Sequence, residues 1–219
     1  MKIVCGIDEA GRGAVIGPLV LAGVIVDEID EEKLRNINVK DSKLLSRKQR
    51  EDLFGKILSI SKGHKIFIIC PAEIDNAVNR NDNLNLNWLE AGHSAAIINE
   101  LAPEKAIVDC PTINTRNYKN YLIEKIQNKN IELNAEHKAD YNYPVVSAAS
   151  ILAKVTRDNE IDKIKKSLNV DFGSGYPSDP MTVAFLENNL QKYPEIFRKT
   201  WSTVRMFEEK KVQRKLGEY

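Results

Sequence analysis

Short apolar runs rich in Ile and Val recur along the chain, and the stretches between them carry apolar residues at helical spacing. Strands are predicted over 2–8, 19–27, 65–70, 105–109 and 131–136. Helices are predicted after the N-cap Ser46, from Pro71, and over 84–101, 118–127, 145–167, 181–192 and 202–215. Three strands come early with tight links, and later strands alternate with helices. This order predicts an α/β fold, a mixed five-stranded sheet flanked by helices, with a helical C-terminal extension.

The length of 219 residues suits one large domain, or one domain with a small appendage. The sequence contains no internal repeat and no low-complexity linker. The one candidate boundary is the loop 171–180, rich in Gly and Pro, which precedes the last two predicted helices.

The overall charge is nearly balanced, with 32 Lys and Arg against 31 Asp and Glu. Apolar residues make up 42% and charged residues 29%, which excludes a disordered chain. A nucleic-acid partner must therefore be bound by a local patch. The segment 198–219 carries seven Lys or Arg and three Glu, so it is either a surface facing nucleic acid or a solvated helix face.

No stretch of the sequence predicts a membrane span. The longest uncharged apolar run, 14–26, is shorter than the roughly 18 residues that a span requires, and it contains Gly and Pro. Asp8 and Glu9 interrupt the apolar N-terminal stretch that a secretory signal would need. Three Cys residues lie far apart, as expected of reduced thiols. We expect a soluble, cytoplasmic protein.

Acidic residues stand where predicted strands end. Asp8 and Glu9 close the first strand, Asp109 closes the fourth, and Asp140 follows the fifth. Such carboxylates commonly converge at one edge of an α/β sheet, where they repel one another unless cations neutralise them. Oxygen ligands without Cys or His favour Mg²⁺ or Mn²⁺. Taken singly, each residue is better explained as a turn or cap residue.

Two features after the first strand qualify this interpretation. Neighbouring residues of a regular strand point to opposite faces, so we expect Asp8 and Glu9 to share a site only if the strand bulges or ends between them. The following Gly11-Arg12-Gly13 turn favours such an ending. GRGAVIGP matches neither a phosphate-binding P-loop nor a dinucleotide fingerprint.

Six stretches in order carry a resemblance to a known family. They are GIDEAGRGAVIGPLV (6–20), KDSK (40–43), IVDCP (107–111), AEHKAD (135–140), PVVSAASILAKVTRD (144–158) and GSGYPSDP (173–180). The sequence resembles ribonuclease HII, the type-two RNase H family, and is most similar to its archaeal members. The resemblance implies a single RNase H-like catalytic domain over 1–219, of which about 181–219 forms a helical C-terminal lobe.

The resemblance also implies an activity. Members of the family are endonucleases that hydrolyse the RNA strand of RNA/DNA hybrids and cut 5′ of single ribonucleotides embedded in duplex DNA, leaving 3′-hydroxyl and 5′-phosphate ends. Their four catalytic, metal-binding carboxylates fall on Asp8, Glu9, Asp109 and Asp140. Four carboxylates suffice to hold two Mg²⁺ or Mn²⁺ ions for phosphodiester hydrolysis.

Substrate-binding residues follow from the same matching. The family's GRG motif, which contacts the ribose 2′-hydroxyl, falls on Gly11, Arg12 and Gly13. The tyrosine that packs on the next sugar falls on Tyr176. Residues expected along the phosphates are Lys43, Lys138 and Ser147, with Asn85 as a weaker candidate for the DNA strand. Asp158 and His137 are interpreted as structural or supporting residues.

Partners and alternatives complete the prediction. We expect RNA/DNA hybrids and ribonucleotide-containing duplexes as substrates, no membrane, and a monomer. The C-terminal helix is expected to bind DNA or a clamp protein, or only to solubilise the tail.

Two other functions stay open. One is another metal-dependent nuclease or strand-transferase of the same fold, which an all-DNA substrate would distinguish. The other is a non-catalytic hybrid-binding protein, which metal-dependent turnover would exclude.

Overall fold

The computed structural model describes residues 2–39, 45–79 and 85–216. Contacts divide the described residues into two compact units. Unit 1 comprises the described residues of 1–10, 20–68 and 86–156, and unit 2 those of 11–19, 69–85 and 157–219. Within the described ranges, no helix has the length and apolar character to traverse a bilayer. The single catalytic domain with a helical lobe stays a prediction.

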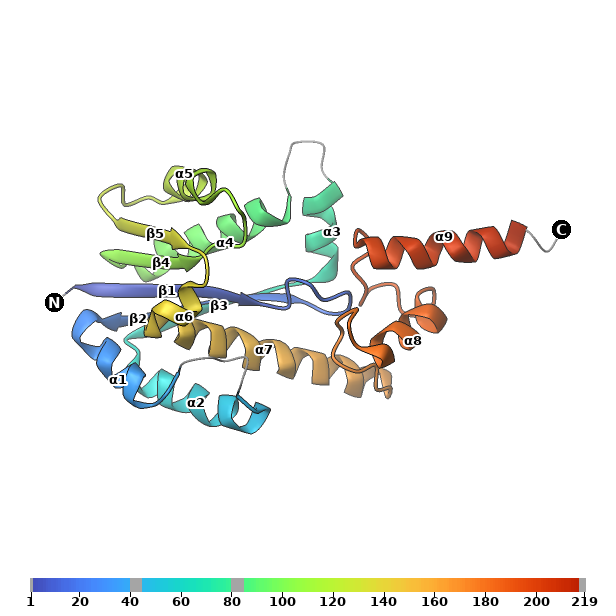
Figure 1. The fold of residues 1–219 in the computed structure, drawn as a ribbon, viewed down its shortest axis with the longest axis horizontal. Helices are drawn as coiled ribbons and strands as arrows, with labels where there is room; N and C mark the ends of the chain where they lie inside the picture. Colours follow the sequence, from blue (N-terminus) through green and yellow to red (C-terminus); the bar gives the residue numbers. More distant parts are fainter. Residues whose placement is uncertain (1, 40–44, 80–84, 217–219) are drawn as a thin grey trace. The chain divides into compact units, whose positions relative to one another are not determined.

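Unit 1 is built on a five-stranded mixed sheet (Figure 1). Its strands are β1 (Ile3–Ala10), β2 (Leu19–Asp27), β3 (Gly63–Ile69), β4 (Lys105–Asp109) and β5 (Glu132–Glu136), in the order β3-β2-β1-β4-β5. β1 pairs antiparallel with β2 and parallel with β4, which in turn pairs parallel with β5. The mixed five-stranded sheet predicted from the hydrophobic pattern is therefore confirmed.

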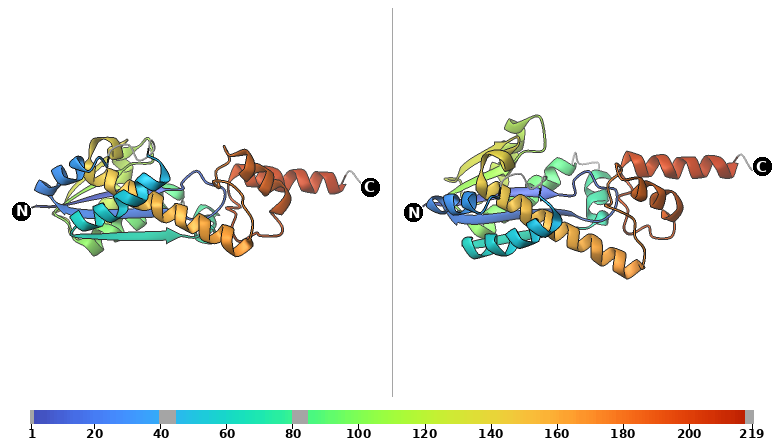
Figure 2. Two further views of the ribbon diagram at one scale, coloured as in Figure 1. Left: turned by 90° about the horizontal axis from the view of Figure 1, so that it is seen from below. Right: turned by 60° about the horizontal axis from the view of Figure 1, so that its bottom comes forward.

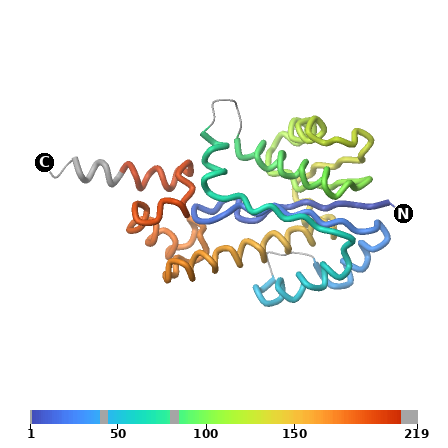
Figure 3. Tube along the Cα trace, turned by 180° about the vertical axis from the view of Figure 1, so that it is seen from behind, coloured from blue at the N-terminus to red at the C-terminus, as the bar shows by residue number. Residues whose placement is uncertain are grey.

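Helices cover both faces of this sheet. They are η1 (Glu28–Asp30), α1 (Glu31–Asn36), α2 (Arg47–Ile60), α4 (Leu86–Leu101), α5 (Thr115–Lys125), α6 (Ala139–Asn142) and α7 (Pro144–Leu168). The views in Figures 2 and 3 show α1, α2 and α7 on one face of the sheet and α4 and α5 on the other. The buried cluster on the first face joins alternate residues of β1 and β2 to apolar residues of these three helices.

Unit 2 has its own apolar core. Its helices are α3 (Pro71–Asn79), α8 (Pro180–Asn189) and α9 (Ser202–Leu216), and the C-terminal part of α7 from residue 157 also belongs to it. Val15 and Ile16, from the segment after β1, are buried there together with Phe172, Phe185 and Phe197. The segment 11–19 is thus held by residues that follow it in the chain by more than 140 positions.

Most predicted elements are found close to their predicted bounds. β2 and β4 match them, and Ser46 caps α2 through a reciprocal capping box with Gln49. β1 extends two residues further than predicted, because Glu9 and Ala10 continue to pair with β2. The short helices α1 and α6 were not predicted, since four to six residues are too few for a visible apolar period.

The start of α7 approaches β1 more closely than a side chain would allow. A methyl group added at Gly6 would lie 2.3 Å from the backbone carbon of Val145 and 2.5 Å from the nitrogen of Val146. Backbone atoms of a helix cannot yield at that distance without moving the helix. Glycine at position 6 therefore sets the spacing between β1 and α7, the two elements that carry Asp8 and Ser150.

Gly6→Ala should destabilise the protein by about 2 kcal/mol or more, because overpacking against a fixed backbone costs roughly 1–3 kcal/mol and sometimes more. Gly55→Ala is the matched control, since Gly55 lies inside α2 and its added methyl group would meet no atom within 4 Å. That control should stabilise the protein by about 0.5–1 kcal/mol. Denaturant unfolding of both variants measures the difference, and equal stabilities would contradict the close-approach argument.

Candidate active site

Parallel pairing brings the acidic ends of β1 and β4 together. Ile7 lies opposite Val108 in the last pair of their ladder, so Asp8 and Asp109 leave adjacent strands at the same level. One carboxylate oxygen each from Asp8, Glu9 and Asp109 lies within 4.8 Å of the others. Asp8 is buried, whereas Glu9 and Asp109 are half-buried. These three residues form the acidic cluster of unit 1.

The expectation that β1 must end or bulge between Asp8 and Glu9 is wrong. β1 keeps a regular register with β2 through both residues, Asp8 opposite Ala22 and Glu9 opposite Leu21. The Asp8 carboxylate instead turns along the strand, where its Oδ1 accepts a hydrogen bond of 2.7 Å from the Glu9 backbone N–H. Pairing of β1 with β4 has stopped at Ile7, which leaves the side chains room at this edge.

Burial and like charge both act on Asp8. Desolvation raises the pKa of the Asp8 carboxyl well above its usual range, and the charges of Glu9 and Asp109 raise it further. A hydrogen bond from the Ser150 side chain in α7 opposes this rise, as does the bond from the Glu9 N–H. A carboxylate group that is buried and crowded by two others is stabilised by a cation bound among them.

The turn after β5 reaches back to this cluster. Asp109 Oδ1 accepts a hydrogen bond of 2.7 Å from the backbone N–H of Ala139, the first residue of α6. Asp140 follows directly, so its backbone is one residue away from the group bonded to Asp109. Among the described residues, the mutually close carboxylates are those of Asp8, Glu9 and Asp109, and Asp140 is half-buried outside that set.

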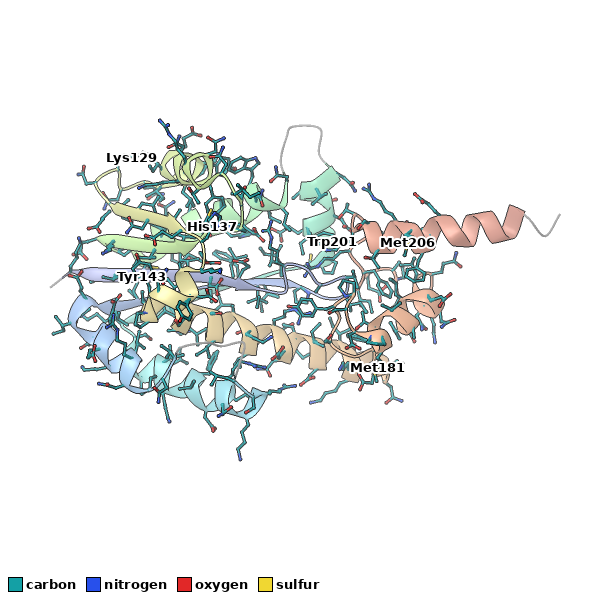
Figure 4. The ribbon with its side chains drawn as sticks, viewed as in Figure 1. Lys129, His137, Tyr143, Met181, Trp201 and Met206 are labelled. Atoms are coloured by element: carbon teal, nitrogen blue, oxygen red, sulfur yellow. The ribbon has the colours of Figure 1, made fainter. Side chains whose placement is uncertain are left out.

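Several side chains hold the α6 turn in place. The hydroxyl of Tyr143 donates to the Glu136 carboxylate at 3.0 Å, and His137 Nδ1 donates to the Cys110 carbonyl oxygen at 3.0 Å. Figure 4 labels His137 and Tyr143, which lie to either side of this turn. His137 therefore joins the ends of β4 and β5, consistent with its interpretation as a supporting residue.

The residues predicted along phosphates have different surroundings. Lys138 is exposed and adopts a left-handed backbone conformation, with φ of 57°, at the N-cap of α6. Ser147 is buried, and its hydroxyl donates to the carbonyl oxygens of Asp140 and Tyr143. Asn85 is exposed just before α4, and Lys43 lies outside the described residues. Phosphate contacts by these residues stay a prediction.

In unit 2, the residues that follow the Gly11-Arg12-Gly13 turn are hydrogen-bonded to the loop that carries Tyr176. The carbonyl oxygen of Gly175 accepts from the N–H groups of Val15 at 2.8 Å and Ile16 at 3.2 Å. Gly13 is exposed, and a methyl group there would meet no atom within 4 Å, so another backbone can approach it. The two segments predicted to read the sugar are thus parts of one hydrogen-bonded structure.

The Tyr176 loop is also fixed to α8. Asp179 caps this helix through the Met181 N–H at 3.0 Å and accepts from the Ser174 N–H at 2.6 Å. The Thr182 hydroxyl accepts from the Gly175 N–H and donates to the Phe172 carbonyl oxygen. Backbone groups of the loop are therefore satisfied by a single helix start, which limits its movement.

Sequence reasoning missed two buried arginines of unit 2, Arg157 and Arg198. Arg157 stands in the VTRD stretch beside Asp158, whose carboxylate lies 4.0 Å from it. Arg198 stands in a segment interpreted only for its charge. The available signal for Arg157 was its place in the PVVSAASILAKVTRD stretch, one of those that carry the family resemblance. No comparable signal marks Arg198, because its burial depends on contacts with residues 12 and 17.

Solved ribonuclease structures have the same arrangement of sheet and helices. Ribonuclease H2 of Pyrococcus horikoshii matches with a TM-score of 0.85 and 43% identity, covering 95% of this chain and 98% of that one. The Archaeoglobus fulgidus ribonuclease HII, solved in complex with PCNA, matches with a TM-score of 0.83 and 40% identity, covering 93% and 96%. The class is therefore a nuclease of the RNase H-like fold, as the motifs implied.

Sequence comparison then defines the family. The family model for ribonuclease HII matches residues 5–204. The ribonuclease HII of Pyrococcus furiosus is 51% identical over 209 residues, which cover 93% of this chain and 90% of that protein. That of Methanococcus maripaludis is 44% identical, covering 92% and 85%. The chain belongs to the ribonuclease HII family of endonucleases, and the predicted similarity to archaeal members is confirmed.

Asp8→Asn should raise the stability of the metal-free protein, because it removes a buried charge that Glu9 and Asp109 repel. The folded-state pKa of Asp8 is raised, so wild-type stability falls as the pH rises from about 4 through that pKa, and the variant should lose less. Thermal unfolding in EDTA at pH 7 should show a higher Tm for the variant. In a chain of this size, 1 kcal/mol corresponds to about 2–4 °C.

The same scans with added Mn²⁺ test the ligand role. Mn²⁺ should raise the Tm of the wild-type protein more than that of Asp8→Asn, since a bound ion stabilises the folded state according to its affinity. Glu187→Gln, at an exposed carboxylate of α8, is the control and should respond like wild type. An undiminished Mn²⁺ response in Asp8→Asn would remove Asp8 from the ligand set.

Proposed function

We propose that this ribonuclease H, besides hydrolysing the RNA strand of RNA/DNA hybrids, cuts 5′ of single ribonucleotides embedded in duplex DNA. The proposed catalytic residues are Asp8, Glu9, Asp109 and Asp140. The observation that carries the proposal is the convergence of three carboxylates within 4.8 Å where the parallel pairing of β1 and β4 ends. Membership of the ribonuclease HII family supports the substrate class.

The donor set of Asp8, Glu9, Asp109 and Asp140 is proposed to hold two divalent cations, Mg²⁺ or Mn²⁺. It consists of carboxylate oxygens, the ligands such ions prefer, and its buried member carries a repulsion that a cation would relieve. Divalent ions would supply Lewis-acid activation of the phosphodiester and of the attacking water. A ribonuclease HIII of the same fold, 18% identical with a TM-score of 0.72, was solved in complex with Mn²⁺.

The protein itself contributes preorganised acidic groups. Asp8 is held by the Glu9 N–H and by Ser150, and Asp109 is held by the Ala139 N–H. Carboxylates fixed in this way need no rearrangement when charge develops at a phosphate, which is where much of the rate enhancement of enzymes arises. Asp140 would join them from the α6 turn, whose position the Glu136–Tyr143 bond fixes.

Selectivity for a ribonucleotide is assigned to unit 2. The 2′-hydroxyl is both donor and acceptor, and it distinguishes RNA from DNA. Backbone groups of the Gly11-Arg12-Gly13 turn would bind it, since glycines admit a close approach. The ring of Tyr176 would pack on the following sugar. Support comes from the bonds from Val15 and Ile16 to Gly175, which join the residues just after the turn to the Tyr176 loop.

A sliding clamp is proposed as a partner through the C-terminal helix. The supporting observation is that the Archaeoglobus fulgidus ribonuclease HII was solved in complex with PCNA. A monomer is proposed as the solution state, on family resemblance alone.

Purified protein should cut a DNA duplex containing one ribonucleotide and a full RNA/DNA hybrid, only with Mg²⁺ or Mn²⁺, and should leave all-DNA uncut. Asp109→Asn should lower cleavage of both substrates by roughly a thousandfold or more while duplex binding survives, because a metal ligand is worth several kcal/mol in the transition state. Gel analysis of labelled strands gives both the rate and the cut position.

Other outcomes would separate the alternatives. Cleavage of all-DNA would favour a different nuclease of the same fold. Cleavage of the hybrid alone would keep the RNase H activity and remove incision at single ribonucleotides. Binding without cleavage by folded protein would indicate a binding protein, and near-wild-type turnover by Asp109→Asn would remove that residue from the catalytic set.

Tyr176→Ala should impair cleavage at an isolated ribonucleotide more than within a long hybrid. In the first substrate the following sugar is a deoxyribose, against which the ring would pack, whereas a 2′-hydroxyl there would be left unpaired. We expect about a tenfold difference between the two losses, of the size that one buried contact of about 1.4 kcal/mol would produce. Steady-state kinetics on both substrates measures it, with Tyr176→Phe as the ring-preserving control. Equal losses on the two substrates would contradict a junction-sensing role.

A further inference from the structure

Two arginines are buried in unit 2. Arg157 is 2% exposed and Arg198 is fully buried, and the charge of Arg157 lowers the pKa of Arg198. Desolvation is the larger cause, and together they bring the pKa of Arg198 to about 9, so it stays cationic at neutral pH. Burying two like charges opposes folding, so the two arginines are poorly explained as a source of stability.

Arg157 lies between the two segments proposed to read the sugar. Its Nη2 donates to the Ser174 carbonyl oxygen at 3.1 Å, and its guanidinium lies over the Tyr176 ring at 4.5 Å. In the Gly11-Arg12-Gly13 turn, a methyl group at Gly11 would lie 2.4 Å from Arg157 Nε. In the Tyr176 loop, a methyl group at Gly175 would lie 3.2 Å from Arg157 Nη2. Glycine in both motifs therefore makes room for this guanidinium.

Arg198 holds the Gly11-Arg12-Gly13 turn from the other end. Its Nη1 donates to the Arg12 carbonyl oxygen at 2.9 Å and its Nε to the Gly17 carbonyl oxygen at 3.0 Å. Its backbone N–H donates to the Val15 carbonyl oxygen at 3.0 Å. The guanidinium also lies 5.0 Å from the ring of Trp201, which Figure 4 labels near the start of α9.

Only an arginine can make these contacts together. A guanidinium presents five donors in a fixed plane and stacks on aromatic rings, whereas lysine offers one charged point on a flexible stem. Within the described residues, Arg157 Nε and Arg198 Nη2 have no hydrogen-bond acceptor. The two guanidinium groups thus hold the loops, although one nitrogen of each has no hydrogen-bond acceptor, which is unfavourable for a buried polar atom.

We propose that Arg157 and Arg198 are positioning residues for ribonucleotide recognition. Arg157 sets the Tyr176 ring against the Gly11-Arg12-Gly13 turn, and Arg198 fixes the carbonyl groups of that turn. The inference rests on the proposed function, because it assigns the two arginines to the segments proposed to read the 2′-hydroxyl and the following sugar.

The test uses Arg157→Lys, Tyr176→Ala and the double variant on two substrates, the single-ribonucleotide duplex and the long hybrid. Arg157→Lys keeps the charge and loses the planar fork, so it should lower kcat/KM about tenfold more on the single ribonucleotide than on the hybrid. In the Tyr176→Ala background, Arg157→Lys should change the ratio of kcat/KM on the single ribonucleotide to kcat/KM on the hybrid by at most about twofold, because the effects of coupled residues are not additive. Arg198→Lys should lower kcat/KM on both substrates, since both present a 2′-hydroxyl.

Controls separate positioning from folding. Arg35→Lys, at an exposed arginine of α1, should retain wild-type kinetics and Tm. Arg157→Met is the second variant, because replacing a buried charge by an apolar side chain of similar size is often neutral for stability. It should fold and show the same loss of substrate preference as Arg157→Lys.

Three outcomes would overturn the inference. They are an unchanged substrate preference in folded Arg157→Lys, additive losses with Tyr176→Ala, and failure of both Arg157 variants to fold, which would assign the residue to stability. A failure of the proposed function would be distinguishable from a failure of this inference, because the wild-type protein would then leave the single-ribonucleotide duplex uncut.

Discussion

The parallel register of β1 and β4 is the constraint on which the acidic cluster depends. With Ile7 opposite Val108, the carboxylates that follow in the two strands have to emerge at the same sheet edge. A shift by one residue would send Asp8 to the opposite face, since side chains alternate along a strand. Gly6 protects this arrangement, because it allows α7 to approach β1 closely enough for Ser150 to bond to Asp8.

The electrostatic character of the cluster follows from that register. Three carboxylates held within 4.8 Å, one of them buried, oppose the stability of the metal-free fold. Active sites commonly store unfavourable interactions of this kind, which the bound ligand or ion relieves. Here the surrounding hydrogen bonds from Glu9 N–H and Ala139 N–H keep the carboxylates in place despite their repulsion.

Unit 2 has the opposite electrostatic arrangement to the acidic cluster of unit 1, because its buried charges are positive. Two guanidinium groups occupy its interior and donate to carbonyl oxygens of the 11–17 turn and of the Tyr176 loop. Loops are ordinarily the most mobile parts of a protein. Arginines fixed by burial provide donors that hold such loops in one conformation, which the proposed recognition of a single hydroxyl group would require.

The sequence by itself determined the sheet, the main helices and the family. The signals for these elements are local: the apolar periodicity, the N-cap Ser46 and the helix start at Pro71. Each specifies a helix or a strand without reference to distant residues. The sequence also identified Asp8, Glu9 and Asp109 as carboxylates that converge at one edge of the sheet. Only the tertiary structure decided how Asp8 and Glu9 share one site within a regular strand. It alone revealed the loop contacts of the buried Arg157 and Arg198. Those of Arg198 join residues some 180 positions apart, which leaves no local pattern in the chain.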